Sequence, residues 1–276
     1  MSNDNEGISF YFFDLDDNTF FLETKIFIKN MKTGDVISVS THEFAQMRNK
    51  MGNTEPWTDY SLYEDSYKNF RDRNEDGEKE YLVEDIEHAM GEPIEKWQGP
   101  AFKLFQHACE QQRPLGIVTA RGHSRETIKA GIQVMVDAGF LSQSPNYLGV
   151  YAVSNEDMRK ELKDSTSEEQ RQVIETHPDP TSQLKRVAIN NLVEQALETY
   201  GSEAEHRFGM SDDDPKNVDL IIKAMCECKI RHPEKRFFVI NTHKGEHVKL
   251  EVFPIDFPVT KNASADEISG WKKGEK

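Results

Sequence analysis

Acidic side chains stand at the ends of two apolar segments of the sequence, where they could share a metal ion. Asp14 and Asp16 follow the apolar run at residues 8–13, and three aspartates at 212–214 follow the run at 206–211. Carboxylates within about 4 to 6 Å of one another raise each other's pKa, so bringing them together is costly unless a divalent cation is bound. Mg²⁺ suits such a set, because it prefers oxygen ligands and often takes one or two carboxylates together with a substrate phosphate.

Two further side chains have the chemistry that binds a phosphoryl group. Thr119 ends the apolar segment 114–118, and Lys185 lies near the start of the amphipathic segment 183–200. A hydroxyl and an ammonium stabilise the charge on phosphoryl oxygens alongside a metal ion. One aspartate could then attack phosphorus, and a second could act as general acid and then as general base.

The elements that must position these residues alternate between strand-like and helical segments. The strand-like runs are residues 8–13, 114–118, 147–153, 206–211 and 236–240, and the helical ones are 102–108, 125–138, 183–200 and 216–229. Such alternation predicts an α/β fold with a Rossmann-like, doubly wound parallel sheet. Ligands bind such sheets beyond the carboxyl ends of the strands, which is where Asp14, Thr119 and Asp212 fall.

The segment that follows the first strand differs from this pattern and predicts an insertion. Residues 25–29 and 36–39 indicate a hairpin, and residues 41–91 read as mostly helical, with Thr41 as a helix N-cap. We therefore expect a core of residues 8–24 and 96–260 and an inserted unit, a hairpin plus helices, at residues 25–95. The polar residues 261–276 are expected to form a disordered tail.

Four motifs, in order along the chain, resemble those of the haloacid dehalogenase (HAD) superfamily of phosphohydrolases. The first is the strand that ends in Asp14-Leu15-Asp16, although Asn18 stands where the family has Thr or Val. The second is Ile117-Val118-Thr119, within Thr-Ala-Arg-Gly. The third is Lys185, which opens the helix leading to the fourth, the aspartates that begin at Asp212.

The resemblance implies a role for each of these residues. Asp14 would be the nucleophile that forms an aspartyl-phosphate, and Asp16, whose presence favours phosphatase or phosphomutase chemistry, would be the general acid and base. The phosphate-binding residues implied are Thr119, Ala120, Arg121 and Lys185. The Mg²⁺ ligands implied are Asp14, Asp16 through its backbone carbonyl, Asp212 and Asp213, with the choice among residues 212, 213 and 214 left open. The insertion would be a cap, which excludes water and selects the leaving group.

The sequence thus predicts a cytoplasmic, Mg²⁺-dependent phosphatase that hydrolyses a phosphate monoester of a small metabolite or nucleotide. The alternatives are a phosphomutase or phosphotransferase, and a catalytically silent, phosphoryl-binding regulatory module. The 34 basic and 49 acidic residues give a net charge of −15, which disfavours nucleic acid as a partner, although a nucleic-acid end stays open. There is no apolar stretch that predicts a membrane helix, and the three cysteines indicate a reducing compartment.

Simpler interpretations exist for several of these residues. Asp14 and Asp16 could form a turn, and one aspartate of the triplet could cap the next helix, as the pair Asp214-Pro215 suggests. Lys160 and Lys163 are rivals of Lys185 as phosphoryl binders. The histidines at 243 and 247 have the spacing of a helical zinc pair, but the glycine between them argues against a helix.

Overall fold

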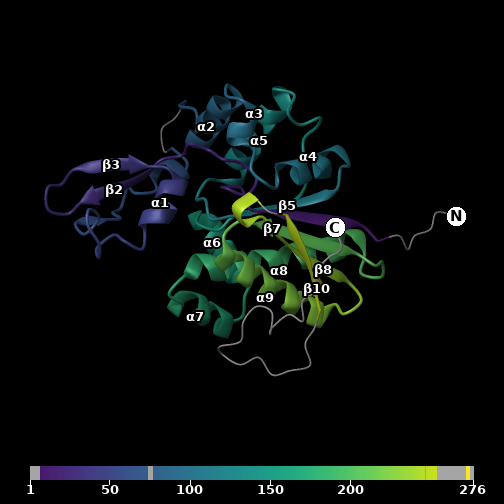
Figure 1. Cartoon of the computed structure of the whole chain (residues 1–276). Coiled ribbons are helices and arrows are strands. Elements are labelled where there is room, and N and C mark those ends of the chain that lie inside the picture. The colour runs from purple at the N-terminus through teal and green to yellow at the C-terminus, as the bar shows by residue number, and fades with distance from the viewer. Residues whose placement is uncertain (1–6, 74–76, 246, 254–271, 274–276) are drawn as a thin grey trace.

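A seven-stranded sheet forms the centre of the computed structural model, which describes residues 7–73, 77–245, 247–253 and 272–273 (Figure 1). The strand order is β10-β9-β8-β7-β1-β5-β6. Five neighbouring strands are parallel: β8 (Arg236–Asn241), β7 (Arg207–Asp212), β1 (Ser9–Phe13), β5 (Pro114–Thr119) and β6 (Asn146–Ala152). Next to β8, the strand β9 (Val248–Val252) and then the edge strand β10 (Lys272–Lys273) pair antiparallel. The predicted α/β fold with a mostly parallel, Rossmann-like sheet is confirmed.

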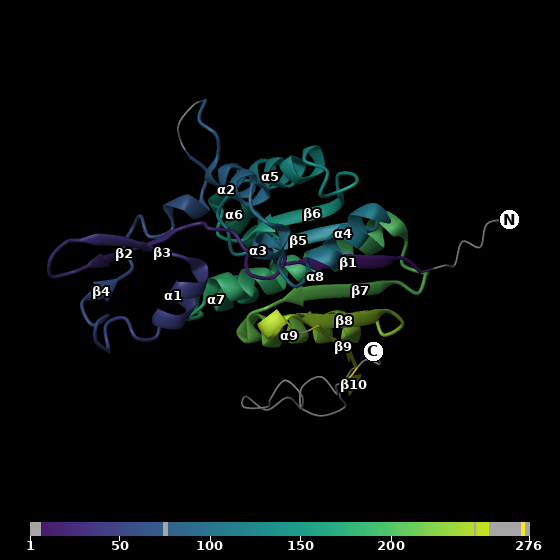
Figure 2. The same cartoon turned by 45° about the horizontal axis from the view of Figure 1, so that its top comes forward.

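Helices cover both faces of the sheet and bury two separate hydrophobic clusters (Figures 1 and 2). The helices on one face are α6 (Glu156–Asp164), α7 (Glu168–Thr176), α8 (Pro180–Tyr200) and α9 (Pro215–Arg231). Those on the other are α2 (Tyr81–Met90), α3 (Ile94–Trp97), α4 (Phe102–Glu110) and α5 (Arg125–Asp137). Successive side chains of β1 point to opposite faces of the sheet. Phe12 therefore packs in the cluster under α6–α9, and Phe13 packs in the cluster under α2–α5.

A smaller sheet follows β1 and protrudes from the main body (Figure 1). It consists of β2 (Ile26–Asn30), β3 (Val36–Val39) and β4 (Tyr60–Ser61), accompanied by α1 (Thr41–Met47) and the 3-10 helix η1 (Lys68–Phe70). Its own hydrophobic cluster contains Ile26, Ile28, Val39 and Met47. By contrast, α2 packs against α5 in a cluster of the main sheet. The separately packed part of residues 25–95 therefore ends before α2.

The expectation of a mostly helical segment from residue 41 to residue 91 is wrong. Turns and β4 lie between α1 and η1, in a stretch that is rich in polar residues and has few apolar residues at helical spacing. Thr41 is also not the N-cap of α1, since Ser40 has the extended backbone and accepts a hydrogen bond from the backbone N–H of Glu43. Glu43 completes a capping box by accepting from the Ser40 N–H.

The predicted disordered tail at 261–276 lies outside the described residues except for Lys272 and Lys273, which form β10 against β9. Among the helices that the structure describes, none is long and apolar enough to cross a bilayer.

The loop after β1 is crossed by the backbone that precedes α4. The Gly99 N–H donates to the Thr19 carbonyl at 3.0 Å, and the Ala101 N–H donates to the Asn18 carbonyl at 2.8 Å. A Cβ at position 99 would lie 2.4 Å from the Asn18 oxygen and 2.7 Å from the Thr19 carbonyl carbon. Because both atoms are backbone, a larger residue would force the chains apart.

We expect Gly99→Ala to lower the free energy of unfolding by about 1–3 kcal/mol, the usual range for overpacking a tight site. Gly209→Ala in β7 is the matched control, since a Cβ there would have its nearest neighbour at 3.7 Å, an ordinary contact. Urea denaturation of both variants measures the difference. Equal midpoints for the two variants would contradict the close backbone crossing.

Candidate active site

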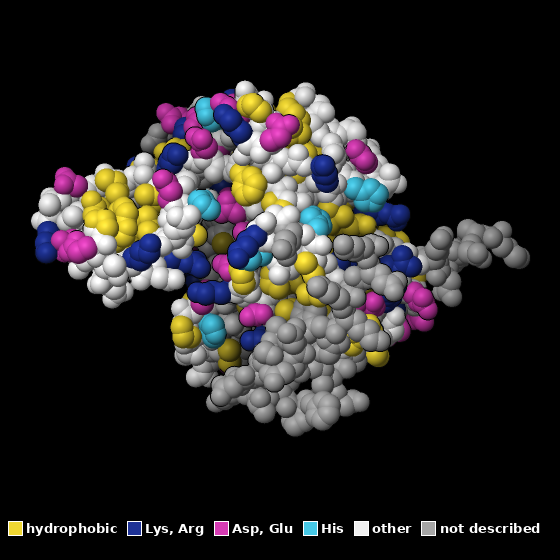
Figure 3. Space-filling model, in the orientation of Figure 1, with side chains coloured by type: hydrophobic (Ala, Val, Ile, Leu, Met, Phe, Trp, Pro, Cys, Tyr) yellow, Lys and Arg dark blue, Asp and Glu magenta, His cyan; other side chains and the backbone are white. Residues whose placement is uncertain are grey.

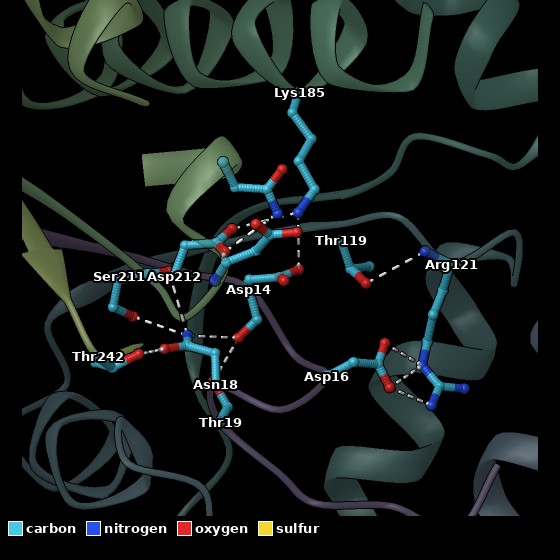
Figure 4. Close-up of polar contacts among 12 residues, drawn as sticks. Asp14, Asp16, Asn18, Thr19, Thr119, Arg121, Lys185, Ser211, Asp212 and Thr242 are labelled. Atoms are coloured by element: carbon cyan, nitrogen blue, oxygen red, sulfur yellow. Dashed lines mark hydrogen bonds and ion pairs between the residues drawn. The ribbon is translucent and has the colours of Figure 1, made fainter. Parts of the chain in front are cut away.

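Asp14, Asp212 and Lys185 meet at the carboxyl ends of the neighbouring strands β1 and β7 (Figure 4). Asp14 is the first residue after β1, Asp212 ends β7, and Lys185 projects from the first half of α8. The Lys185 Nζ lies 3.3 Å from Asp14 Oδ1 and 3.3 Å from Asp212 Oδ2. All three side chains are buried, so the ion pairs are screened little by water.

Three carboxylates in this cluster could hold a cation. Asp14, Asp212 and Asp213 each offer an oxygen, and these oxygens lie within 4.8 Å of one another. A donor set made only of carboxylates fits Mg²⁺. Asp214 has a different role, since its carboxylate accepts a hydrogen bond from the Lys216 N–H at 2.9 Å and caps α9. Of the three consecutive aspartates, the structure thus gathers the first two around the site.

The electrostatics of the metal-free site show how much charge is concentrated there. Burial raises the pKa of Asp14 well above its ordinary value; Lys185 lowers it, and Asp212 raises it further. Burial acts to lower the pKa of Lys185, but Asp14 and Asp212 outweigh it and raise that pKa. Burial and the neighbouring Asp212 raise the pKa of Asp213 to about 7. A bound cation would favour the ionised form of each carboxylate.

Asp16 is held away from this cluster by Arg121. The Arg121 Nε donates to Asp16 Oδ2 at 2.9 Å and Nη2 donates to Asp16 Oδ1 at 2.6 Å, a two-pronged ion pair. Arg121 is buried under the Phe70 ring, whose centre lies 4.8 Å from the guanidinium carbon, and Nη2 also donates to the Thr24 hydroxyl at 2.8 Å. Arg121 is thus engaged with a carboxylate here, whereas the resemblance implied contact with a phosphate.

The remaining residues of the second motif lie at the end of β5. Thr119 is the last residue of the strand and is buried, and its hydroxyl accepts a hydrogen bond from the Arg121 N–H at 3.3 Å. Ala120 lines the cavity beside the cluster. The Gly122 N–H donates to the Phe70 carbonyl at 2.8 Å, which joins this loop to the smaller sheet's unit.

Asn18 supports the site in a way that the sequence analysis did not find. It is fully buried, and its Nδ2 donates to the Asp14 carbonyl and to the Ser211 hydroxyl, each at 3.0 Å. Its Oδ1 accepts from the Thr242 hydroxyl at 2.8 Å, so one amide ties together the ends of β1, β7 and β8 (Figure 4). Thr19 adds a hydrogen bond to the Asp14 carbonyl. The sequence did carry a signal for this role, because two polar residues, Asn18 and Thr19, follow the first motif closely.

A cavity of about 850 Å³ opens beside the cluster, between the strand ends and α1 (Figure 3). It is lined by five of the predicted site residues, namely Asp14, Asp16, Ala120, Lys185 and Asp213. The remaining lining comes mainly from α1, from the start of α9 and from the turn after β8. The size is within the range of about 300–1,000 Å³ that is typical of small-molecule sites.

The other residues considered for phosphate or metal binding lie away from this cluster or contact other groups. Lys160 and Lys163 line a different pocket on α6, and Lys163 pairs with Glu175 at 2.9 Å. His243 lies in the 3-10 turn η2 (His243–Gly245), and His247 lies 2.8 Å from the Pro100 carbonyl through its Nε2, so the two do not form the helical pair of a zinc site. The three cysteines, Cys109, Cys226 and Cys228, are free and buried.

The fold and the site together define a class: an α/β protein with a buried aspartate and lysine cluster at the carboxyl ends of its parallel strands, next to a cavity. Comparison of the chain with protein-family models, with curated proteins and with solved structures gives no match. Its function is therefore argued from its own residues.

The affinity for Mg²⁺ is expected to rise with pH and to level off above about pH 7. In the metal-free protein the pKa of Asp213 is about 7, so at lower pH the cation must displace a proton, and affinity falls up to about tenfold per pH unit. Isothermal titration calorimetry in buffers of different ionisation enthalpy measures both the affinity and the proton released.

Two variants make this measurement specific. Asp214→Asn should keep the pH dependence, because asparagine also caps helices, whereas Asp213→Asn should weaken binding and flatten the profile. An affinity that is independent of pH from about 6 to about 8 in the unaltered protein would exclude Asp213 as a ligand.

Proposed function

We propose that the chain is a Mg²⁺-dependent phosphatase of the HAD superfamily that hydrolyses a phosphate monoester of a small metabolite or nucleotide through an aspartyl-phosphate. One observation carries the proposal: the buried carboxylate of Asp14 faces Lys185 inside a cluster with Asp212 and Asp213, next to a cavity. Asp16 lies two residues further along and lines the same cavity. This placement supplies a nucleophile, a charge-neutralising cation, metal ligands and an acid or base.

The proposed reaction has two steps. In the first, the Asp14 carboxylate attacks phosphorus and the bond from phosphorus to the leaving oxygen breaks, while protonated Asp16 gives its proton to that oxygen. In the second, Asp16 takes a proton from a water molecule, which attacks phosphorus and releases Asp14 and inorganic phosphate. Lys185 and the Thr119 hydroxyl stabilise the phosphoryl oxygens. A bound Mg²⁺, held by Asp14, Asp212 and Asp213, would supply further positive charge next to the phosphoryl group.

The ion pair between Asp16 and Arg121 favours a second candidate. Since Arg121 binds both oxygens of Asp16, Asp16 must leave this pair before it can donate a proton to a leaving group. A phosphoryl-binding module without turnover would have no need for that movement.

The unit formed by β2, β3, β4 and α1 is proposed to be the cap. Two contacts hold α1 across the cavity: the Thr41 hydroxyl donates to Asp17 Oδ1 at 3.2 Å, and Arg48 Nη2 lies 3.8 Å from Asp214 Oδ2. Both are polar and partly exposed, and such contacts exchange readily with water. The three free cysteines fit a reducing cytoplasm, where we place the protein.

Hydrolysis of para-nitrophenyl phosphate is expected to require Mg²⁺ and to fall at least about 10³-fold in Asp14→Asn, because the amide is a far weaker nucleophile than the carboxylate. Release of nitrophenol, followed with and without Mg²⁺, measures this, and circular dichroism shows that the variant is folded. Undiminished activity of Asp14→Asn would exclude Asp14 as the nucleophile. An inactive protein that is nonetheless stabilised by beryllofluoride with Mg²⁺ would point to the silent module.

Asp16→Asn is expected to lose about 10²- to 10⁴-fold in rate on an alkyl phosphate, whose leaving oxygen needs a proton. The loss in the first step should be smaller on para-nitrophenyl phosphate, since nitrophenolate leaves without one. Single-turnover rates on the two esters separate this step from the later hydrolysis of the aspartyl-phosphate. Equal losses on both esters would assign Asp16 another role.

A further inference from the structure

The cavity beside the aspartate cluster carries basic residues as well as acidic ones. Its acidic lining residues all come from the loops after β1 and β7, and they are Asp14, Asp16, Asp17, Asp213 and Asp214. Its basic residues outside the cluster are Arg48, the C-cap of α1, and Lys244, in the turn η2 next to the Asp213 loop; with His42 and His243 they form what we call the basic wall. Basic side chains gather around the hollow (Figure 3), although the chain as a whole carries a net charge of −15.

The basic groups on this wall are weakly paired. Arg48 has one ion pair among the described residues, to Asp214 at 3.8 Å, and both side chains are more than a third exposed. Exposed pairs at such distances contribute little, so Arg48 can exchange this partner for another anion. For Lys244, the described part of the chain provides no ion pair and no side-chain hydrogen bond. Two positive charges are therefore available to a ligand in the cavity.

The turn that carries Lys244 is fixed relative to the nucleophile. The Thr242 hydroxyl donates to Asn18 Oδ1 at 2.8 Å, and Asn18 in turn donates to the Asp14 carbonyl. The ring of His243 contacts the Asp213 carbonyl at 3.1 Å through Nδ1. These bonds set the backbone position of Lys244 before any ligand binds, which lowers the entropy cost of using it.

We propose that the substrate's leaving group carries a second anionic group, a phosphate or a carboxylate, which binds at the wall formed by Arg48 and Lys244. The inference rests on the proposed phosphatase function, in which Lys185 and the metal ligands take the phosphate that is hydrolysed. A single phosphate is already provided for at the aspartate cluster, which leaves Arg48 and Lys244 available to a second negative charge. Phe21, Ile26 and Phe44 also line the cavity and would contact the carbon skeleton.

Binding to the full-length Asp14→Asn variant with Mg²⁺ tests the inference without turnover. The ligands are glucose 6-phosphate, 6-phosphogluconate and glucose 1,6-bisphosphate, which share a six-carbon chain with a phosphate at C6 and differ in the group at C1; the chain is open in 6-phosphogluconate and cyclic in the other two. Isothermal titration calorimetry should show that one of the two doubly anionic ligands binds at least about tenfold more tightly than glucose 6-phosphate. A factor of this size is what one hydrogen bond to a charged group usually contributes. Whichever of these two ligands binds more tightly identifies the second anionic group as a carboxylate or a phosphate.

Substitutions on the basic wall connect this preference to its residues. In the Asp14→Asn background, Arg48→Gln and Lys244→Gln should each reduce the ratio of doubly to singly anionic affinity by about threefold or more. The matched control is Lys103→Gln on α4, an exposed lysine outside the cavity, which should leave the ratio unchanged. Added salt should lower the ratio in the parent and less so in the two wall variants.

Two results would overturn the inference, and they differ from failure of the proposed function. If the unaltered protein hydrolyses para-nitrophenyl phosphate with Mg²⁺ but the doubly anionic ligands have no advantage, the second anion site is wrong and the phosphatase stands. An advantage that survives in Arg48→Gln and Lys244→Gln equally excludes this wall. If no ester is hydrolysed and none of the three ligands binds, both proposals fail.

Discussion

Repulsion between buried carboxylates is the constraint that organises this molecule. Asp14, Asp212 and Asp213 each place an oxygen within 4.8 Å of the others, and water screens them little because the first two are buried and the third is half-buried. Lys185 offsets part of this charge, while burial first and the neighbouring carboxylates next raise the pKa of Asp14 and of Asp213. Keeping these groups assembled therefore costs the folded protein stability, and the proposed cation would reduce that cost.

The rest of the fold keeps these groups from moving apart. Parallel pairing of β1 with β7 places the two strand ends side by side, and α8 delivers Lys185 from one face of the sheet. Asn18 then links the backbone of Asp14 to the loops after β7 and β8. One buried amide holds three strand ends together, so the position of Asp14 depends on tertiary contacts and not on local turn geometry alone.

Much of the central sheet and of the aspartate cluster could be predicted from the sequence, because apolar runs that end in charged residues clearly mark buried parallel strands. The five core strands and the meeting of Asp14, Asp212 and Asp213 follow from that pattern, whereas Lys185, a helix residue, was assigned to the site by the resemblance to the HAD superfamily. The stretch between α1 and α2 was mispredicted, since it has few apolar residues to set a period and its structure depends on turns. The pairing of Arg121 with Asp16 and the links made by Asn18 join residues far apart in the chain, and no local pattern encodes such contacts.

The residues that line the cavity belong to units with separate hydrophobic clusters. The aspartates stand on strands whose side chains fill the two large clusters, whereas α1 belongs to a small cluster of its own. His42 in α1 and the C-cap residue Arg48 line the cavity, are exposed and contribute nothing to the main core. Substitutions there can accumulate at little cost in folding, so in the proposed phosphatase the choice of substrate can evolve while the chemical step is kept.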